Sequence, residues 1–104
     1  MNFSNAIEAL KQGKCLTRSI WKNTDKKFIF KQVPAEIKQE IVPKMQSLPD
    51  DAKKQFQLTF ENEADQITAI YYCNQIALVG LSNSIDSYSA SAQDIFAEDW
   101  LIVE

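Results

Sequence analysis

The sequence predicts an α+β domain, in which an antiparallel sheet carries an N-terminal helix and several short helices packed on it. Three observations lead to this fold class. The chain opens with a helical pattern of apolar residues, its second half is rich in β-forming residues, and it closes on a short apolar strand. With 104 residues, the chain is expected to form a single domain, residues 1–104, around one hydrophobic core.

The first expected element is an amphipathic helix over residues 3–12. Its apolar residues recur at helical spacing: Phe3, Ala6, Ile7 and Leu10. Gly13 is expected to end it, because glycine readily takes the left-handed backbone conformation found after many helices. A short strand over residues 15–18 comes next and places Leu16 and Arg18 on the same face.

The middle of the chain is divided by three prolines and predicts two further helices. Residues 28–30 are expected to form a strand, and residues 35–42 a short helix. A longer helix is expected over residues 49–57. Ser47 is expected to cap it, with Pro49 in the first turn, where a missing N–H is harmless.

From Gln66 onward the composition favours strands. They are expected over residues 67–72, 76–81, 85–88 and 100–103. Before the last strand, Ser91 and Asp94 have the spacing of a capping box, which predicts a short helix through Ala97. Trp100, in the closing strand, is assigned to the core.

The composition excludes several classes of enzyme. The chain has no histidine, two glycines and two cysteines. Without histidine there is no Ser-His-Asp triad or Cys-His dyad, and two isolated glycines cannot build a phosphate-binding loop. The densest acidic run, residues 61–65, lacks the central glycine and closing glutamate of a calcium loop. We therefore expect no catalysis, no cofactor and no metal.

Net charge and the absence of targeting signals predict the class of partner and the cellular location. A formal net charge of -3 argues against DNA or RNA as a partner, since affinity for a phosphate backbone needs clustered lysine and arginine. The lysine-dense stretch over residues 22–31 is interpreted as the solvated entry to a strand. Cys15 and Cys73 match no metal spacing and are expected to be reduced core thiols. With no signal peptide and no apolar run of about 20 residues, we expect a cytoplasmic protein that does not enter a membrane.

Two aromatic residues lie in polar surroundings. Trp21 follows the only arginine, Arg18, by three residues, and Tyr88 lies among serines that include Ser91. An aromatic face beside a guanidinium suits a nucleobase and a phosphate, because stacking needs a flat partner and arginine offers planar bidentate donors. The alternative is that both aromatic residues belong to the core or to a subunit interface, and the residues alone favour neither.

Both ends of the chain resemble a known family. The similarity lies in the opening run MNFSNAIEALKQGK, in the spacing Arg18-x-x-Trp21, and in the closing run from Tyr88 to Trp100, which contains Asp-x-x-Ala-x-Asp-Trp. These motifs are similar to the second Thoeris anti-defence family of small phage and prophage proteins. The closing pattern is the most specific of the three.

The resemblance implies a non-enzymatic sponge that blocks bacterial anti-phage defence. Members of that family bind cyclic nucleotide-derived immune signals, such as glycocyclic ADP-ribose, and hold them intact so that the host effector is not activated. They assemble as homotetramers with ligand pockets between subunits. Tyr88 stands where many relatives have tryptophan, and Ala92 where many have glutamine. Residues 33–66 form a longer insertion relative to the shortest relatives.

The expected ligand is thus a cyclic nucleotide-derived small molecule of the glycocyclic ADP-ribose or cyclic oligonucleotide type. We expect Trp21 and Tyr88 to stack on a base or ribose and Arg18 to hold phosphate. Hydrogen bonds are expected from three polar side chains: Asn74, Gln75 and Ser91. Asp94 is expected to cap its helix instead of contacting ligand. The alternative is a protein-interaction module that inhibits a host effector directly, with the same aromatic residues as interface anchors.

Overall fold

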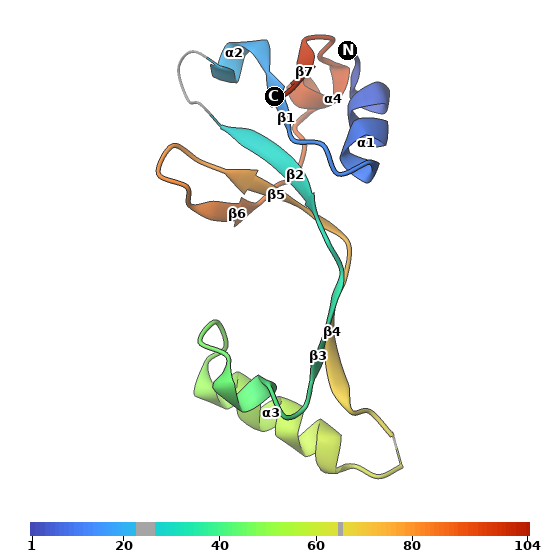
Figure 1. The fold of residues 1–104 in the computed structure, drawn as a ribbon, viewed down its shortest axis with the longest axis vertical. Coiled ribbons are helices and arrows are strands. Elements are labelled where there is room, and N and C mark those ends of the chain that lie inside the picture. Colours follow the sequence, from blue (N-terminus) through green and yellow to red (C-terminus); the bar gives the residue numbers. More distant parts are fainter. Residues whose placement is uncertain (23–26, 65) are drawn as a thin grey trace. The chain divides into compact units, whose positions relative to one another are not determined.

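The computed structural model describes residues 1–22, 27–64 and 66–104, and it confirms the α+β class. The chain divides into two compact units (Figure 1). Unit 1 combines Met1–Val33 with Asn74–Glu104, and unit 2 is Pro34–Cys73.

Unit 1 is built on a five-stranded antiparallel sheet. In spatial order its strands are β6 (Ile85–Ser87), β5 (Gln75–Val79), β2 (Phe28–Gln32), β1 (Leu16–Arg18) and β7 (Trp100–Ile102). Strand β1 pairs with β7, so that Arg18 lies directly opposite Trp100. The sheet therefore brings the two sequence motifs at opposite ends of the chain side by side.

Three helices accompany this sheet: α1 (Phe3–Lys11), α2 (Ser19–Lys22) and α4 (Ala92–Phe96). The prediction for α1 is confirmed. Its N-terminus is capped by the side chain of Asn2, and it ends before Gly13, whose φ of +87° is readily accessible only to glycine. The prediction for α4 is also confirmed, since the Ser91 hydroxyl accepts a hydrogen bond from the backbone N–H of Asp94 at 3.2 Å.

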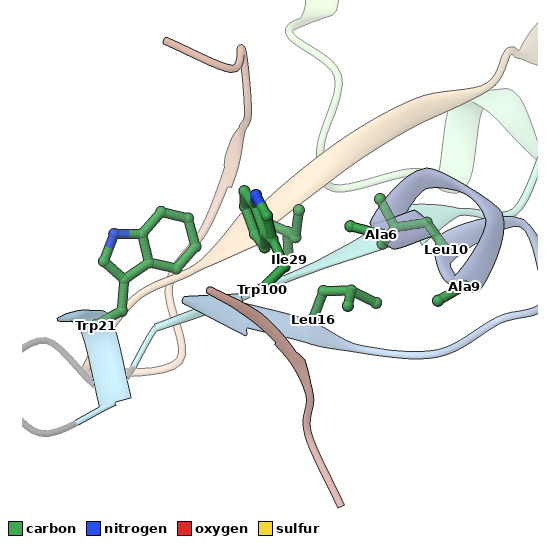
Figure 2. Close-up of a cluster of buried hydrophobic side chains, with 7 residues drawn as sticks. All are labelled: Ala6, Ala9, Leu10, Leu16, Trp21, Ile29 and Trp100. Carbon is green, nitrogen blue, oxygen red and sulfur yellow. The ribbon is translucent and has the colours of Figure 1, made fainter. Parts of the chain in front are cut away.

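The hydrophobic core of unit 1 gathers around Trp100 (Figure 2). Its buried members are Ala6, Ala9, Leu10, Leu16, Trp21, Ile29 and Trp100. Trp100 is fully buried, as predicted. Its ring centroid lies 5.6 Å from that of Phe3 and 5.3 Å from that of Trp21. The indole N–H of Trp100 donates to the carbonyl of Asp94 at 2.9 Å, so this burial leaves no indole donor unpaired.

Unit 2 is a β-hairpin with helical segments. Strand β3 (Ala35–Lys38) pairs with the antiparallel strand β4 (Ala69–Tyr72). Between them lie the 3-10 helix η1 (Val42–Lys44) and helix α3 (Asp50–Glu61). Among the described helices of the whole chain, none is both long and apolar enough to span a membrane.

Two predictions in unit 2 are wrong. Residues 35–42 do not form a helix. Instead, Ile37 lies opposite Ile70 in the hairpin, because pairing with β4 outweighs the weak helical spacing of two isoleucines. Ser47 does not cap α3, whose N-cap residue is Pro49 with no side-chain hydrogen bond. Helix α3 also continues to Glu61, beyond the predicted end at residue 57.

The prediction of two core thiols is also wrong. Both cysteines are free, as expected, but Cys15 is only half-buried and Cys73 is exposed. Cys73 follows directly after the last residue of β4, where the chain leaves the hairpin. The apolar side chain of Cys73 favours burial, but residue type alone does not predict a position at the end of a strand.

Candidate functional site

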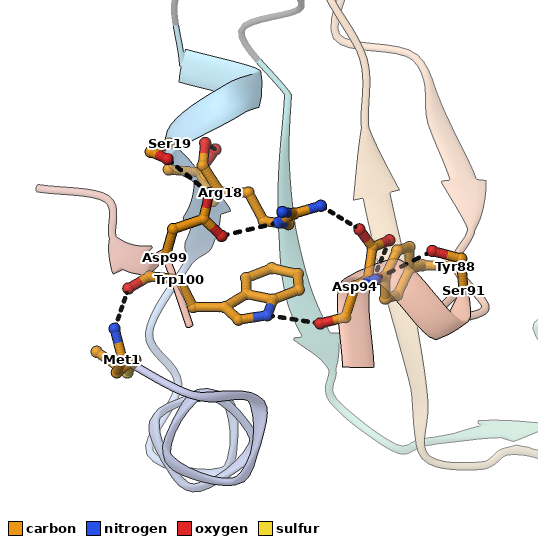
Figure 3. A network of polar contacts seen from close by, with 9 residues as sticks. Met1, Arg18, Ser19, Tyr88, Ser91, Asp94, Asp99 and Trp100 are labelled. Atoms are coloured by element: carbon orange, nitrogen blue, oxygen red, sulfur yellow. Dashed lines mark hydrogen bonds and ion pairs between the residues drawn. The ribbon is translucent and has the colours of Figure 1, made fainter. Parts of the chain in front are cut away.

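Arg18 lies at the centre of an ion-pair network (Figure 3). Its Nε donates to Oδ1 of Asp99 at 2.9 Å, and its Nη1 donates to Oδ1 of Asp94 at 2.9 Å. The three side chains are 11%, 31% and 14% exposed, respectively. Two ionised carboxylates surround one guanidinium, so the network has a formal charge of about -1 and the cation is already neutralised by protein groups.

Two hydroxyl groups complete this network. Ser19 Oγ donates to Oδ2 of Asp99 at 2.6 Å, and the Tyr88 hydroxyl donates to Oδ2 of Asp94 at 2.9 Å. Each carboxylate therefore accepts a hydrogen bond on both of its oxygens. The prediction that Asp94 serves as a cap needs correction. Ser91 supplies the cap, and the Asp94 carboxylate links helix α4 to Arg18 and Tyr88.

The same contacts shift three pKa values. Burial lowers the pKa of Arg18, but hydrogen bonds and charges from Asp99 and Asp94 outweigh it and raise that pKa overall. The hydrogen bond from Ser19, followed by that from Arg18, lowers the pKa of Asp99. Burial, followed by the hydrogen bond to Asp94, raises the pKa of Tyr88. At neutral pH the network thus holds a cation, two anions and a neutral phenol.

Trp21 is part of the core of its own protomer. It is delivered by α2, the short helix that starts directly after Arg18, and is 6% exposed. Its ring meets those of Trp100 and Tyr88 edge to face, with centroids 5.3 and 6.3 Å away. The ammonium group of Lys27 lies 4.8 Å from the centroid of the Trp21 ring. Within the protomer, these contacts agree with the alternative that Trp21 is a core residue.

The six predicted ligand-binding residues fall into two groups. The network brings four of them together: Arg18, Trp21, Tyr88 and Ser91. Asn74 and Gln75 lie instead at the start of β5, where they line a mainly apolar cavity of about 290 Å³ that also includes Lys11 and Lys31. Contact of these six residues with a ligand stays a prediction.

Another cavity of unit 1, also about 290 Å³, has a different character. It is lined by Thr17, Lys22, Lys27, Phe28, Leu101, Ile102, Val103 and Glu104. Its lining thus combines two lysines and a phenylalanine with Glu104. The Thr17 hydroxyl donates to the carbonyl of Lys27 at 2.8 Å, which fixes the entry to β2.

Sequence reasoning missed this second cavity. The sequence predicts a solvated strand entry over the lysine-dense residues 22–31, and residues 23–26 of this stretch lie outside the described part of the chain. One signal could have found the site. Lys22 directly follows Trp21 and Lys27 directly precedes Phe28, and paired lysines beside aromatic residues are typical of anion-binding surfaces that also stack a ring.

Comparison with known families now adds to this geometry. A sequence model of the Thoeris anti-defense 2-like domain matches residues 1–103. The chain belongs to this family. No protein of curated function matches the chain. The family match extends over both units of this Thoeris anti-defense 2-like protein, and it includes the Arg-x-x-Trp and Asp-x-x-Ala-x-Asp-Trp motifs that meet around Arg18. Membership is consistent with a role in counteracting bacterial anti-phage defence.

Proposed function

We propose that this Thoeris anti-defense 2-like protein is a non-enzymatic sponge. It binds a cyclic nucleotide-derived immune signal, of the glycocyclic ADP-ribose or cyclic oligonucleotide type, and keeps that signal from its effector in the cytosol of the bacterial host. The observation that carries the proposal is the family match over residues 1–103. Sequestration requires only tight binding, and a Kd of about 1 nM corresponds to roughly -12 kcal/mol.

The carboxylates of the motif support binding without chemistry. A general acid that works near neutral pH needs a raised pKa, and a general base needs hydrogen-bond reach to the substrate proton that it takes. The pKa of Asp99 is lowered instead, and each oxygen of Asp94 and Asp99 already accepts a hydrogen bond. Across the described ranges, no group of three or more acidic or cysteine side chains is placed to hold a metal ion. These features favour a container over a catalyst.

The size of the cavities supports ligand pockets that two subunits share. Each of the cavities described above for unit 1 measures about 290 Å³. Pockets that enclose a small molecule usually measure about 300–1,000 Å³. A cyclic dinucleotide or an ADP-ribose derivative would fill such a cavity and extend beyond it. We propose that walls from a second copy complete the enclosure, in keeping with the homotetramer that the family resemblance implies.

Calorimetry of the purified protein tests the sponge directly. The panel consists of cyclic ADP-ribose isomers and cyclic oligonucleotides, and we expect nanomolar binding of at least one member. Ligand released by heat denaturation should have an unchanged mass, and light scattering should give about four times the protomer mass of 11.9 kDa. Failure to bind any member of the panel would contradict the sponge. Recovery of a cleaved or otherwise altered ligand would contradict the non-enzymatic mechanism.

Exposed apolar side chains favour a second candidate, direct inhibition of a host effector protein. Phe96 on α4 is 82% exposed, and Leu81 is 71% exposed. Aromatic side chains such as that of Phe96 are enriched in protein interfaces. If this candidate is correct, Phe96→Ser should abolish inhibition of the purified effector in the absence of any nucleotide. A sponge instead blocks the effector only indirectly, by removing the signal that activates it.

A further inference from the structure

We propose that unit 2 contains a binding site for an uncharged, planar heteroaromatic molecule that carries a ring N–H group. The site is a cavity between helix α3 and strand β4, and its lining is mainly apolar and aromatic. The described lining residues are Leu48, Phe56, Thr59, Phe60, Ile67, Ala69, Ile70, Tyr71 and Tyr72. All of them lie in unit 2, whereas the Arg18 network lies in unit 1, so this site is independent of the proposed sponge.

The size of this cavity suits a bicyclic ring. Its volume is about 370 Å³, compared with about 290 Å³ for each cavity described in unit 1. Pockets that enclose a small molecule usually measure about 300–1,000 Å³, and an apolar cavity of about 150 Å³ already binds benzene. A planar bicyclic molecule therefore fits here without a second copy of the chain to complete the walls.

Helix α3 presents an aromatic face to the cavity. Phe56 and Phe60 are one helical turn apart, and Thr59 lies on the same face. All three side chains are half-buried, and none of the residues of α3, every one of which is described, is fully buried. Ring surface is therefore left uncovered. A flat ring in the cavity would cover it, because aromatic rings attract one another in offset-stacked and edge-to-face arrangements.

Thr59 gives the cavity a hydrogen-bond acceptor. Its hydroxyl donates to the carbonyl of Gln55 at 3.2 Å, one turn earlier in α3. A hydroxyl has one proton and two lone pairs, so the Thr59 oxygen can still accept a hydrogen bond from a ligand. The described residues that line the cavity have no charged side chain, and an unpaired charge is costly to bury. An uncharged N–H group is the complementary partner.

Both walls of the cavity are held by contacts within unit 2 (Figure 1). The Lys53 ammonium group donates to the carbonyl of Pro43 at 3.0 Å, which ties α3 to η1. On the other wall, β4 is paired with β3, and Ile70 lies opposite Ile37. The site is thus built on a helix and a paired strand. Walls that are already ordered lower the cost of binding.

The test compares two ligands of nearly the same shape, each titrated into the isotope-labelled full chain and followed by NMR. Indole has a ring N–H group, and benzofuran has an oxygen atom in its place. We expect both to bind saturably, with shifts concentrated at Thr59, Phe60 and Ile70. Thr59→Val keeps the shape of the side chain and removes the acceptor. It should weaken indole binding about fivefold, the value of one hydrogen bond, and change benzofuran binding less than about twofold.

Two further variants separate this site from a structural effect. Phe60→Leu should weaken the binding of both ligands by about threefold or more, because it removes an aromatic surface that both of them contact. Thr68→Val is the matched control. It makes the same change as Thr59→Val at a residue of unit 2 that does not line the cavity, and it should leave both affinities unchanged.

Three results would overturn the assignment, provided that melting temperatures show each variant to be folded. One is equal weakening of indole and benzofuran binding in Thr59→Val. Another is binding that does not saturate, or shifts that centre on Leu10 and Trp100 of unit 1. The third is a set of shifts at Thr59 and Phe60 that follows protein concentration without indole, which would mean that a second copy of the chain covers the cavity.

Discussion

Replacement of Arg18 by alanine should destabilise the protein strongly. The substitution leaves the carboxylates of Asp94 and Asp99 without their cation, while one of them remains 14% and the other 31% exposed. Exposed ion pairs are worth about 0.2–1 kcal/mol, whereas removal of one partner from a buried pair costs about 3–5 kcal/mol. The ion pairs of Arg18 with Asp94 and Asp99 lie between an exposed pair and a fully buried one, and they are closer to the buried case. We therefore expect a loss of about 3 kcal/mol in the free energy of unfolding.

Thermal unfolding followed by circular dichroism measures this loss. For a domain of this size, 1 kcal/mol corresponds to roughly 4–8 °C, so Arg18→Ala should lower Tm by about 12–24 °C. A double-mutant cycle with Asp94→Ala should give a coupling energy of about 1–3 kcal/mol, because the two side chains form a direct ion pair. The matched control is Lys11→Ala. It removes an exposed pair with Glu8, whose two side chains are 62% and 65% exposed, and it should change stability by less than about 0.5 kcal/mol.

Two results would refute this reasoning about Arg18. One is a Tm for Arg18→Ala within a few degrees of the native value. The other is a coupling energy with Asp94 near zero. Either result would mean that the guanidinium is not held by the protein, and it would return Arg18 to the direct phosphate contact that the sequence motif implies.

Three further changes concern the Arg18 network and the end of helix α1. Tyr88→Phe should lower the free energy of unfolding by about 1 kcal/mol, because it removes one hydrogen bond to Asp94. In difference titrations against this variant, the Tyr88 phenol should ionise above the usual pKa of about 10. The stability that the neutral phenol supplies should be present below about pH 10 and should fall as pH rises further. Because folding lowers the pKa of Asp99, the stability that its carboxylate supplies should be present above the unfolded-state pKa of about 3.9 and lost as pH falls below it. In Asp99→Asn, the urea midpoint should therefore fall less steeply as the pH is lowered. An unchanged dependence of the midpoint on pH would contradict this. Gly13→Ala should cost about 1 kcal/mol from its φ of +87° alone, since no atom outside its immediate neighbours lies within 4 Å of the added methyl group; a neutral effect in urea unfolding would show that the chain relaxes there.

The sequence predicted the elements whose signals are local. Helix α1 has apolar residues at helical spacing and a glycine at its end, and α4 has a serine cap three residues before Asp94, so both were predicted with small errors in length. The region over residues 35–42 failed because its structure depends on a partner strand more than thirty residues away, Ala69–Tyr72. Spacing within a segment carries no information about such a partner, and pairing across the sheet then decides the conformation.

The site shows the same division between local and distant information. The sequence predicted one site of six residues, and the structure brings four of them together: Arg18, Trp21, Tyr88 and Ser91. Asn74 and Gln75 lie at another cavity. The sequence could not identify the partners of Arg18, because Asp94 and Asp99 are 76 and 81 residues away and reach it only through the pairing of β1 with β7. A lone arginine therefore looked available for a ligand when its charge was already neutralised.

A motif that is used entirely in holding the fold can identify a family without identifying its ligand. The Arg-x-x-Trp and Asp-x-x-Ala-x-Asp-Trp motifs bind each other across the sheet. Their charged residues in the network, Arg18, Asp94 and Asp99, all have hydrogen-bond partners. We therefore expect the ligand preference of the proposed sponge to depend on residues outside the motifs. The cavity with Lys22, Lys27, Phe28 and Glu104 is formed by such residues. Two proteins that share this network should therefore fold alike even where their ligands differ.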